Sequence, residues 1–332
     1  MKKYLFSLLL IPCLSCKTQQ ESGTFTGSIE ILDNRALVML DPEAKPEIIT
    51  SGYAWTEGPL WLEDEQALLF SDIPNNSVFR YQHRETTLYL KPSGYTGEQA
   101  RGGEVGSNAL LLDPAGNLIL LQHGDRRIAR MESPIDQPTT SYTTLAGTYE
   151  NRRLNSPNDG VYDSKGNLYF TDPPYGLEKG AQDPAKELEM QGIYRLTPDG
   201  ALTLLATQTR PNGIALGLDE SYLLVSNSDP GQAVWLRYDF DQDGNLGMPI
   251  VFHDCTHLIN QPGQQGLPDG MKMHSSGFLF ASGPAGIWVF DPQGVPVAKI
   301  HTGEKTSNCA FSADEKTLFM TADSHVMQLK LK

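Results

Sequence analysis

Six side chains that carry a carboxylate or a carboxamide recur at one register of this 332-residue sequence. Each stands ten or eleven residues before the first leucine of a short apolar run, and these leucines are Leu68, Leu118, Leu168, Leu223, Leu279 and Leu318. The six side chains, which we call the oxygen ring, are Glu57, Asn108, Asn158, Asn212, Asp269 and Asn308. Asn and Asp are common in turns, but this preference does not explain why all six positions carry a carboxylate or a carboxamide and none is Ser, Gly or Thr. Brought together in a narrow channel, such side chains would be costly to bury without partners.

The composition of the oxygen ring favours a hard divalent cation as that partner. The ring contains no His or Cys, which disfavours Zn²⁺, while Glu57 and Asp269 supply two negative charges. Ca²⁺ is the preferred ion because it accepts many irregularly placed oxygen ligands, and Mg²⁺, Mn²⁺ and Zn²⁺ fit less well.

The segments that carry the ring predict how it is assembled. Each one reads as a polar residue, a short apolar strand, a tight turn and a second apolar strand. The leucines recur at intervals of 50, 50, 55, 56 and 39 residues, and each interval holds two further strand-like pieces. Four antiparallel strands per repeat predict an all-β fold, a six-bladed β-propeller with four antiparallel strands per blade. We expect the propeller to span residues 35–332, with residues 36–50 closing the ring against the C-terminal blade.

One stretch, SPNDGVYDSKGNLYFTD at residues 156–172, looks at first like a calcium loop. An EF-hand would need oxygen ligands at positions 1, 3 and 5 and Gly at 6. Counted from Asp163, position 3 is Lys165 and position 6 is Leu168, which does not fit. Asp163 to Gly166 instead predicts a type I turn between two strands.

Loop lengths indicate which rim of the propeller binds a ligand. The connections at 91–107, 173–191 and 252–268 are long, and they lie at the rim where the first strands begin and the oxygen ring enters the channel. Hairpin geometry returns the ends of the second strands to that rim, where Asp72, His123, Asp172 and Asn227 should surround the ring. We expect Asp72 and Asn227 to form hydrogen bonds between blades, and we regard His123 and Asp172 as candidates for the site.

The N-terminus predicts export. Two Lys precede an apolar run from Tyr4 to Leu14, too short to span a membrane and typical of a signal peptide over residues 1–15. Leu14-Ser15-Cys16 resembles a bacterial lipoprotein signal, in which Cys16 is lipidated; Cys13 fits less well because Pro12 precedes it. Residues 16–34 are then a tether and the protein is anchored in the bacterial cell envelope. A plain signal would make it periplasmic or secreted.

The composition restricts the partners. A net charge of −14 argues against a nucleic acid. The protein would contact the membrane only through its lipid anchor at Cys16, and no protein partner is implied. Cys255 and Cys309, which remain after the signal region, are too few for a disulfide framework and should be buried.

Several motifs together resemble the regucalcin/gluconolactonase (luciferin-regenerating) family, and most closely its bacterial gluconolactonases. They are WTEGPLW, QHGDRR, RLNSPNDG, FTDPPYG, RPNGIALGLDE, LPDGM and TSNCAFS, which span nearly all of the chain from about residue 50. The resemblance implies a six-bladed propeller, one catalytic divalent cation and hydrolysis of sugar lactones. It implies Glu57, Asn212 and Asp269 as metal ligands and Asn158 as a substrate contact. The family's animal members carry an Arg where this chain has Ser156, so other residues, such as Arg101, His123, Tyr175 or the upper loops, must contact the substrate.

The residues and the resemblance together predict a Ca²⁺-dependent lactonase acting on a small sugar lactone such as glucono-1,5-lactone. The cation would polarise the lactone carbonyl, and the resemblance assigns activation of water to Asp269, with Asp172 as a second candidate for proton transfer. Asn108, His123 and Asn308 join Asn158 as expected substrate contacts. A Ser nucleophile is disfavoured because there is no G-x-S-x-G motif and no Ser in the ring.

Two other interpretations remain open at this point. The same propeller and metal could hydrolyse another ester or a phosphotriester. Alternatively, the protein could be a sugar-binding propeller whose metal is structural, because a fold does not determine a function.

Overall fold

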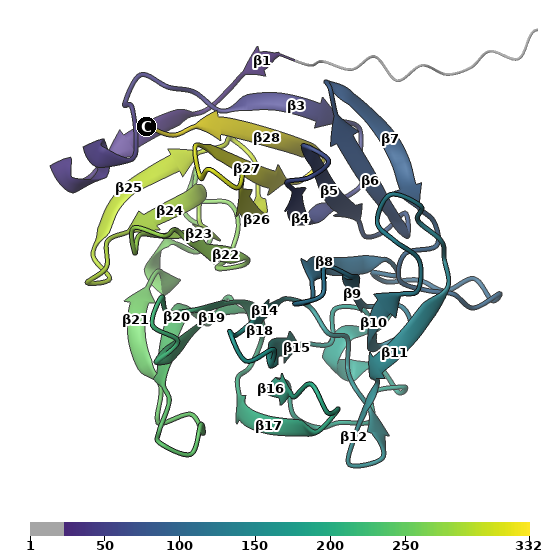
Figure 1. Ribbon diagram of the computed structural model, residues 1–332. Helices are drawn as coiled ribbons and strands as arrows, with labels where there is room; N and C mark the ends of the chain where they lie inside the picture. Colours follow the sequence, from purple (N-terminus) through teal and green to yellow (C-terminus); the bar gives the residue numbers. More distant parts are fainter. Residues whose placement is uncertain (1–22) are drawn as a thin grey trace, which may run out of the picture.

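Six antiparallel sheets surround a central channel in the computed structural model, which describes residues 23–332 (Figure 1). Blade 1 contains β4 (Thr56–Leu62), β5 (Ala67–Asp72), β6 (Ser77–Gln82) and β7 (Glu85–Leu90). Blade 2 contains β8 (Ser107–Leu112), β9 (Leu118–Gln122), β10 (Arg127–Met131) and β11 (Tyr142–Ala146). Blade 3 contains β14 (Gly160–Tyr162), β15 (Leu168–Asp172), β16 (Gly192–Leu196) and β17 (Leu202–Thr207).

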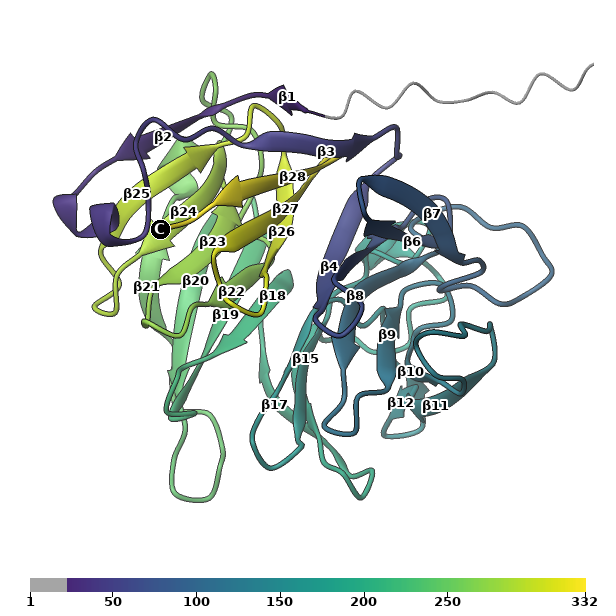
Figure 2. The same cartoon turned by 45° about the horizontal axis from the view of Figure 1, so that its top comes forward.

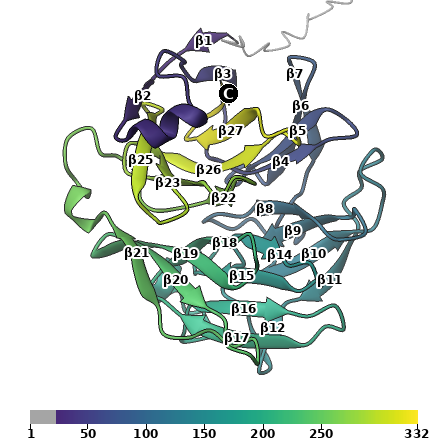
Figure 3. The same cartoon turned by 60° about the vertical axis from the view of Figure 1, so that its left-hand side comes forward.

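The remaining blades follow the same order from the channel outward. Blade 4 contains β18 (Pro211–Leu216), β19 (Tyr222–Asp229), β20 (Gln232–Asp239) and β21 (Ile250–Asp254). Blade 5 contains β22 (Met271–Met273), β23 (Leu279–Gly283), β24 (Gly286–Phe290) and β25 (Pro296–His301). Blade 6 contains β26 (Thr306–Phe311), β27 (Thr317–Ala322), β28 (His325–Lys330) and β3 (Glu47–Ser51). Figure 3 shows this order for blades 2 to 4, from the inner β8, β14 and β18 to the outer β11, β17 and β21.

The minor elements lie outside this pattern. A small hairpin pairs β12 (Thr148–Tyr149) with β13 (Arg152–Arg153). Three 3-10 helices are η1 (Asn34–Val38), η2 (Gly180–Gln182) and η3 (Thr256–Leu258), and residues 23–332 contain no α-helix. No helix in that part of the chain is long and apolar enough to cross a bilayer. The expected six-bladed propeller is confirmed.

The ring is closed by pairing the two ends of the described chain. β3 pairs antiparallel with β28, as in Val326 opposite Thr50, so the expected closing strand is confirmed (Figure 1). Two further strands precede it: β1 (Thr24–Phe25) pairs with β3, and β2 (Ser28–Ile31) runs along the outer edge of β25 (Figure 2). Residues 24–31, expected in a tether, are therefore part of the propeller, because their backbone groups complete the outer edges of blades 5 and 6. The expected signal peptide at 1–15 and the lipidated Cys16 lie outside the described residues.

Six hydrophobic clusters fill the six interfaces between neighbouring blades. The interface of blades 6 and 1, for example, joins Ile49 and Val326 to Leu68 and Phe70. Cys255 and Cys309 are unpaired and buried in two of these clusters, as expected. Burial of apolar surface between neighbouring blades, rather than within one blade, therefore stabilises the closed propeller.

The turn at Asp163 has the predicted geometry. Gly166 N donates to Asp163 O at 3.1 Å, and Asp163 Oδ1 accepts from the backbone N–H groups of Lys165 and Asn167 at 3.0 and 2.8 Å. Gly166 has φ +82°, a conformation that favours glycine. The stretch is a hairpin turn and not a calcium loop.

Shortening a buried side chain of the closing strand β3 should destabilise the whole propeller. Ile49 is 1% exposed, so Ile49→Ala should lower the free energy of unfolding by about 2–5 kcal/mol through loss of burial and a residual cavity. Val38→Ala is the control, because Val38 is 66% exposed and its truncation should change stability by less than about 0.5 kcal/mol. Urea denaturation followed by tryptophan fluorescence measures both. Equal effects would contradict a stabilising role for the closure.

Candidate active site

An irregularity in each blade turns the oxygen ring into the channel. The pairing of first and second strands shifts register at Glu57, at Asn108, at Asn212 and beside Asn308. In blades 3 and 5 the first strand begins only at Gly160 and Met271, two residues after the ring positions. Bulges of this kind re-aim a side chain at the rim of a sheet.

Glycines next to the ring allow neighbouring first strands to approach closely. A Cβ on Gly58 would lie 2.2 Å from Asn108 O, and a Cβ on Gly213 would lie 2.1 Å from Asp269 O. Each of these glycines follows one ring residue and contacts the ring residue of the next blade. The pairs Glu57-Gly58 and Asn212-Gly213 in the sequence therefore reflect a steric requirement of the channel.

Hydroxyl groups at the ends of the second strands hold the ring's backbone. Ser71 Oγ donates to Asn108 O at 2.9 Å, Thr171 Oγ1 to Asn212 O at 2.6 Å, and Ser226 Oγ to Asp269 O at 2.8 Å. Each of these hydrogen bonds links one blade to the next. The ring is thus positioned from its backbone, and its side chains remain available.

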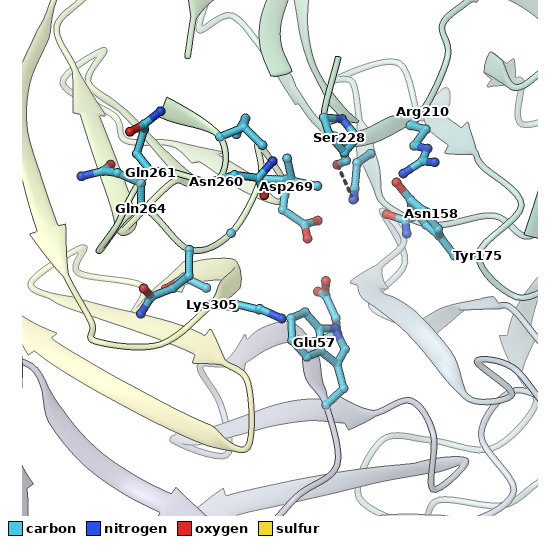
Figure 4. Close-up of a pocket in the computed structure, with 18 of the residues that line it drawn as sticks. Glu57, Asn158, Tyr175, Arg210, Ser228, Asn260, Gln261, Gln264, Asp269 and Lys305 are labelled. Carbon is cyan, nitrogen blue, oxygen red and sulfur yellow. Dashed lines mark hydrogen bonds between the residues drawn. The ribbon is translucent and has the colours of Figure 1, made fainter. Parts of the chain in front are cut away.

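A pocket of about 770 Å³ opens above the ring, within the size range of small-molecule sites. In Figure 4 the Glu57 and Asp269 carboxylates point toward each other across it. Asn158, Tyr175 and Arg210 lie on one side, and Asn260, Gln261 and Gln264 line the opposite wall (Figure 4). Five of the six ring residues line this pocket: Glu57, Asn108, Asn158, Asn212 and Asp269.

The sixth ring residue, Asn308, supports Glu57 instead. Its Nδ2 lies 3.4 Å from Glu57 Oε2, and its Oδ1 accepts a hydrogen bond from Cys309 N at 2.8 Å. Asn308 is 2% exposed and does not line the pocket. The expected substrate contact is therefore not seen, and Asn308 positions a neighbouring carboxylate.

The positions of the oxygen ring disfavour the ionised forms of its two carboxyl groups. Burial raises the pKa of the Glu57 carboxyl to about 8, and the charge on Asp159 adds to this rise. Burial and then repulsion from Glu57 raise the pKa of Asp269 well above its usual range. Asp159, which the sequence register did not select, is 1% exposed, and its Oδ2 has no hydrogen-bond partner. In the sequence, only its position next to Asn158 could have identified Asp159.

The donor set fits a hard cation. The buried oxygens Asn108 Oδ1, Asn212 Oδ1 and Asp269 Oδ1 have no hydrogen-bond partner within residues 23–332. No three His, Cys, Asp or Glu side chains in that part of the chain form a metal-binding cluster, so the donors would combine carboxylates with amide oxygens. Oxygen ligands of mixed type suit Ca²⁺ better than Zn²⁺.

Asp172 does not reach the pocket. It is fully buried, and its Oδ2 and Oδ1 accept hydrogen bonds from the backbone N–H groups of Asn155 and Ser156 at 2.7 and 2.8 Å. Burial raises its pKa to about 7. The geometry does not support direct proton transfer to substrate, and Asp172 instead holds the turn that leads to Asn158.

The same device recurs in other blades. Asp72 Oδ1 accepts from Ala54 N and Trp55 N at 3.2 and 3.3 Å, and Asn227 Oδ1 accepts from Arg210 N at 2.8 Å. Asp72 and Asn227 are structural, as expected, although their hydrogen bonds lie within their own blade and not between blades. His123 is fully buried and is not in the pocket wall, so the structure does not place it as a direct substrate contact.

Ser156, which stands where animal members of the family carry Arg, organises a neighbouring loop. Its Oγ donates to Pro173 O at 2.5 Å and accepts from Gly176 N at 2.9 Å. These bonds hold the turn that directs Tyr175 into the pocket. Arg101 donates to Gly124 O and Gly176 O and is absent from the pocket wall, so of the suggested substitutes Tyr175 and the upper loops are the ones that reach the site.

Residues 55–324 match the SMP-30/Gluconolactonase/LRE-like region family. The chain belongs to this family. This confirms the resemblance seen in the motifs. Within the SMP-30/gluconolactonase/LRE-like family, the chain is 36% identical to the gluconolactonase of Zymomonas mobilis over 94% of its own length and 88% of that protein.

Two other comparisons are with proteins of named activity. A gluconolactonase structure from Xanthomonas campestris superposes with a TM-score of 0.78 at 28% identity, covering 94% of this chain and 100% of that one. The diisopropyl-fluorophosphatase of Loligo vulgaris is 30% identical over 52% of this chain and 55% of its own length.

The raised pKa values predict how pH affects the metal-free protein. The folded state holds protons on Glu57 and Asp172 that the unfolded state releases above pKa values of 4.5 and 3.8. Stability in chelator should therefore fall as the pH rises from about 4 to about 8. Glu57→Gln should make this fall smaller, because Gln carries no charge.

Thermal unfolding in EDTA across this pH range measures the effect. The matched control is Glu98→Gln, an exposed carboxylate outside the pocket. If Glu57→Gln and the control followed the wild-type pH dependence equally, the buried charge on Glu57 would not be its cause.

Proposed function

We propose that this protein is a divalent-cation-dependent lactonase that opens a sugar lactone such as glucono-1,5-lactone, with Ca²⁺ as the preferred ion. The observation that carries the proposal is the pair of facing carboxylates, Glu57 and Asp269, at the base of an open pocket beside unpartnered amide oxygens. Family membership and the gluconolactonase relatives support lactone hydrolysis.

Glu57, Asn212 and Asp269 would hold the cation. When bound there, it would supply Lewis-acid polarisation of the lactone carbonyl. Glu57 Oε2 accepts from Gly58 N at 2.9 Å, and Asn212 Nδ2 donates to Ser228 Oγ at 2.9 Å, while Asn212 Oδ1 has no hydrogen-bond partner within residues 23–332. These two hydrogen bonds fix the orientation of the Glu57 and Asn212 side chains.

The chain's own residues account for the remaining steps. Asp269 accepts a proton from the water that attacks the carbonyl carbon, and returns this proton to the ester oxygen of the lactone as the bond between that oxygen and the carbonyl carbon breaks. The products are the open-chain acid and its new hydroxyl group, so one water is added in balance. Asn158 and Asn108, which line the pocket, would orient the lactone.

A panel of sugar lactones tests the proposal. Purified protein should acidify a pH-stat well above the uncatalysed rate on at least one lactone with Ca²⁺, and should lose this activity with EDTA. Asp269→Ala and Asn158→Ala should each reduce turnover by at least about a hundredfold, because each removes a group at the reacting carbonyl.

The two variants separate metal binding from substrate contact. In calorimetric titrations with Ca²⁺, Asp269→Ala should bind the ion more weakly, while Asn158→Ala should bind it as the wild type does. Well-folded, Ca²⁺-loaded protein without turnover on any lactone would refute the proposal. Stoichiometric zinc in the purified protein would contradict the preference for a hard ion.

A second candidate activity is hydrolysis of a phosphotriester at the same pocket. The observation that favours it is the partial similarity to diisopropyl-fluorophosphatase described above. A phosphotriester in the same pH-stat panel distinguishes the two, since the lactonase proposal requires the larger kcat/KM on a lactone. Binding of sugars without turnover would instead favour a non-enzymatic propeller.

We also propose that the protein is anchored in the cell envelope through Cys16. The predicted export signal and the Ser15-Cys16 pair support this. Cys16→Ser in the full chain should move the protein from the membrane fraction to the soluble fraction and abolish labelling by an alkyne fatty acid. Cys13→Ser is the control and should change neither. Unchanged labelling of Cys16→Ser would rule out this anchor.

A further inference from the structure

A carboxylate outside the oxygen ring also faces the pocket. Glu104 lies in the long loop between β7 and β8, lines the pocket, and keeps 36% of its side chain exposed. Its Oε2 lies 3.0 Å from His123 Nδ1. No other polar partner of the Glu104 carboxylate is found within residues 23–332, so Oε1 is available to a ligand.

The loop that carries Glu104 is fixed close to that residue. Gly106 N donates to Ile73 O at 2.8 Å, and Gly106 O accepts from His123 N at 3.1 Å. A Cβ on Gly106 would lie 2.7 Å from Ile73 O, which shows how closely the two chains approach. His123 thus contacts the loop through both its backbone and its ring, and this contact restricts where the Glu104 carboxylate can lie.

Because His123 is buried, it is the fixed partner in this contact and Glu104 is the residue that it positions. The residue is fully buried, its Nε2 has no polar partner in the described part of the chain, and its Nδ1 lies 3.0 Å from Glu104 Oε2 without the geometry of a hydrogen bond. A buried imidazole with one polar neighbour is stabilised by keeping that neighbour in place. His123 is therefore a positioning residue for Glu104 and does not itself contact the pocket.

The chemistry of the pocket indicates what Glu104 would bind. An ionised carboxylate only accepts hydrogen bonds, so its ligand must offer donors. Glu57 and Asp269 face the bottom of the pocket, where the carbonyl end of a lactone would lie. The hydrogen-bond donors that a sugar lactone offers are its hydroxyl groups, which begin on the carbon next to the carbonyl.

We propose that Glu104, held by His123, is the specificity-determining residue that accepts hydrogen bonds from the hydroxyl groups of the lactone. The proposal rests on the lactonase function proposed above and names the feature of the substrate that the pocket recognises. It also provides the hydroxyl contact for which this chain lacks an Arg at position 156.

The test compares lactones with and without hydroxyl groups. For Glu104→Gln we expect kcat/KM on the best substrate of the sugar-lactone panel to fall about 10- to 100-fold, the range for a hydrogen bond to a charged group. On δ-valerolactone, which has no hydroxyl groups, it should change less than about threefold. Glu98→Gln, in the same loop but outside the pocket, should change neither.

Binding of the product provides a measurement that does not depend on turnover. Calorimetry with the open-chain acid of the best substrate should show a Kd raised about 10- to 100-fold by Glu104→Gln, while the Kd for Ca²⁺ stays as in the wild type. His123→Asn keeps an N–H donor on the Glu104 side and should retain most of the activity. His123→Leu should raise KM on the sugar lactone, with little change in kcat, and should add little to Glu104→Gln in the double variant.

Three outcomes would overturn the proposal. Equal losses on both lactones would place Glu104 at the reacting carbonyl or the cation. Unchanged product binding and kcat/KM would remove Glu104 from recognition. A loss that tracks a lower thermal midpoint, and appears equally in His123→Asn, would indicate a structural role. If the wild type hydrolyses no lactone at all, the proposed function itself fails, which this comparison separates from a failure at Glu104.

Discussion

The crowding of six first strands around one narrow channel is the constraint from which the rest of the site follows. Gly58 and Gly213 are required because the carbonyl of the next blade's ring residue occupies the space of a side chain. The same crowding brings Glu57 and Asp269 to face each other at the base of the pocket, where neither charge is favourable. A site of this kind gains most from a ligand of opposite charge, since binding relieves repulsion that already exists.

The structure separates the placement of reactive groups from the recognition of a substrate. The ring is held by hydrogen bonds to its backbone, from hydroxyls such as Thr171 Oγ1, and these bonds cross from blade to blade. The upper wall depends on loops, each held by one buried side chain: Ser156 for the turn with Tyr175, and His123 for the loop with Glu104. Loop residues can therefore vary among relatives without disturbing the ring.

The sequence predicted the elements and the ring better than it predicted what each outer residue does. The register of six oxygens was visible because every blade repeats one hairpin, and five of the six reach the pocket. Asp172 and His123 were correctly placed near the rim, but the direction of a side chain depends on bulges and loop paths that no repeat encodes. Glu104 was missed for the same reason, as it lies in the irregular connection between β7 and β8, outside the hairpin that every blade repeats.

The boundary of the propeller shows a further limit of sequence reasoning. Strands β1 and β2 are short, and their neighbours β3 and β25 belong to the two blades at the C-terminal end of the chain. Such strands are hard to distinguish from a tether by sequence, because β2 is stabilised by β25 and by a hydrophobic cluster formed largely by residues far along the chain.

That closure also determines the order in which the protein can be completed. β3 is synthesised early, yet its partner β28 lies almost at the last residue. Until β28 has been synthesised, β3 can pair only with the two-residue strand β1, and the interface of blades 6 and 1 cannot form. Contacts of such long sequence separation slow folding and leave strand edges exposed meanwhile. The blade that contains both ends of the described chain can therefore be completed only after β28 has appeared.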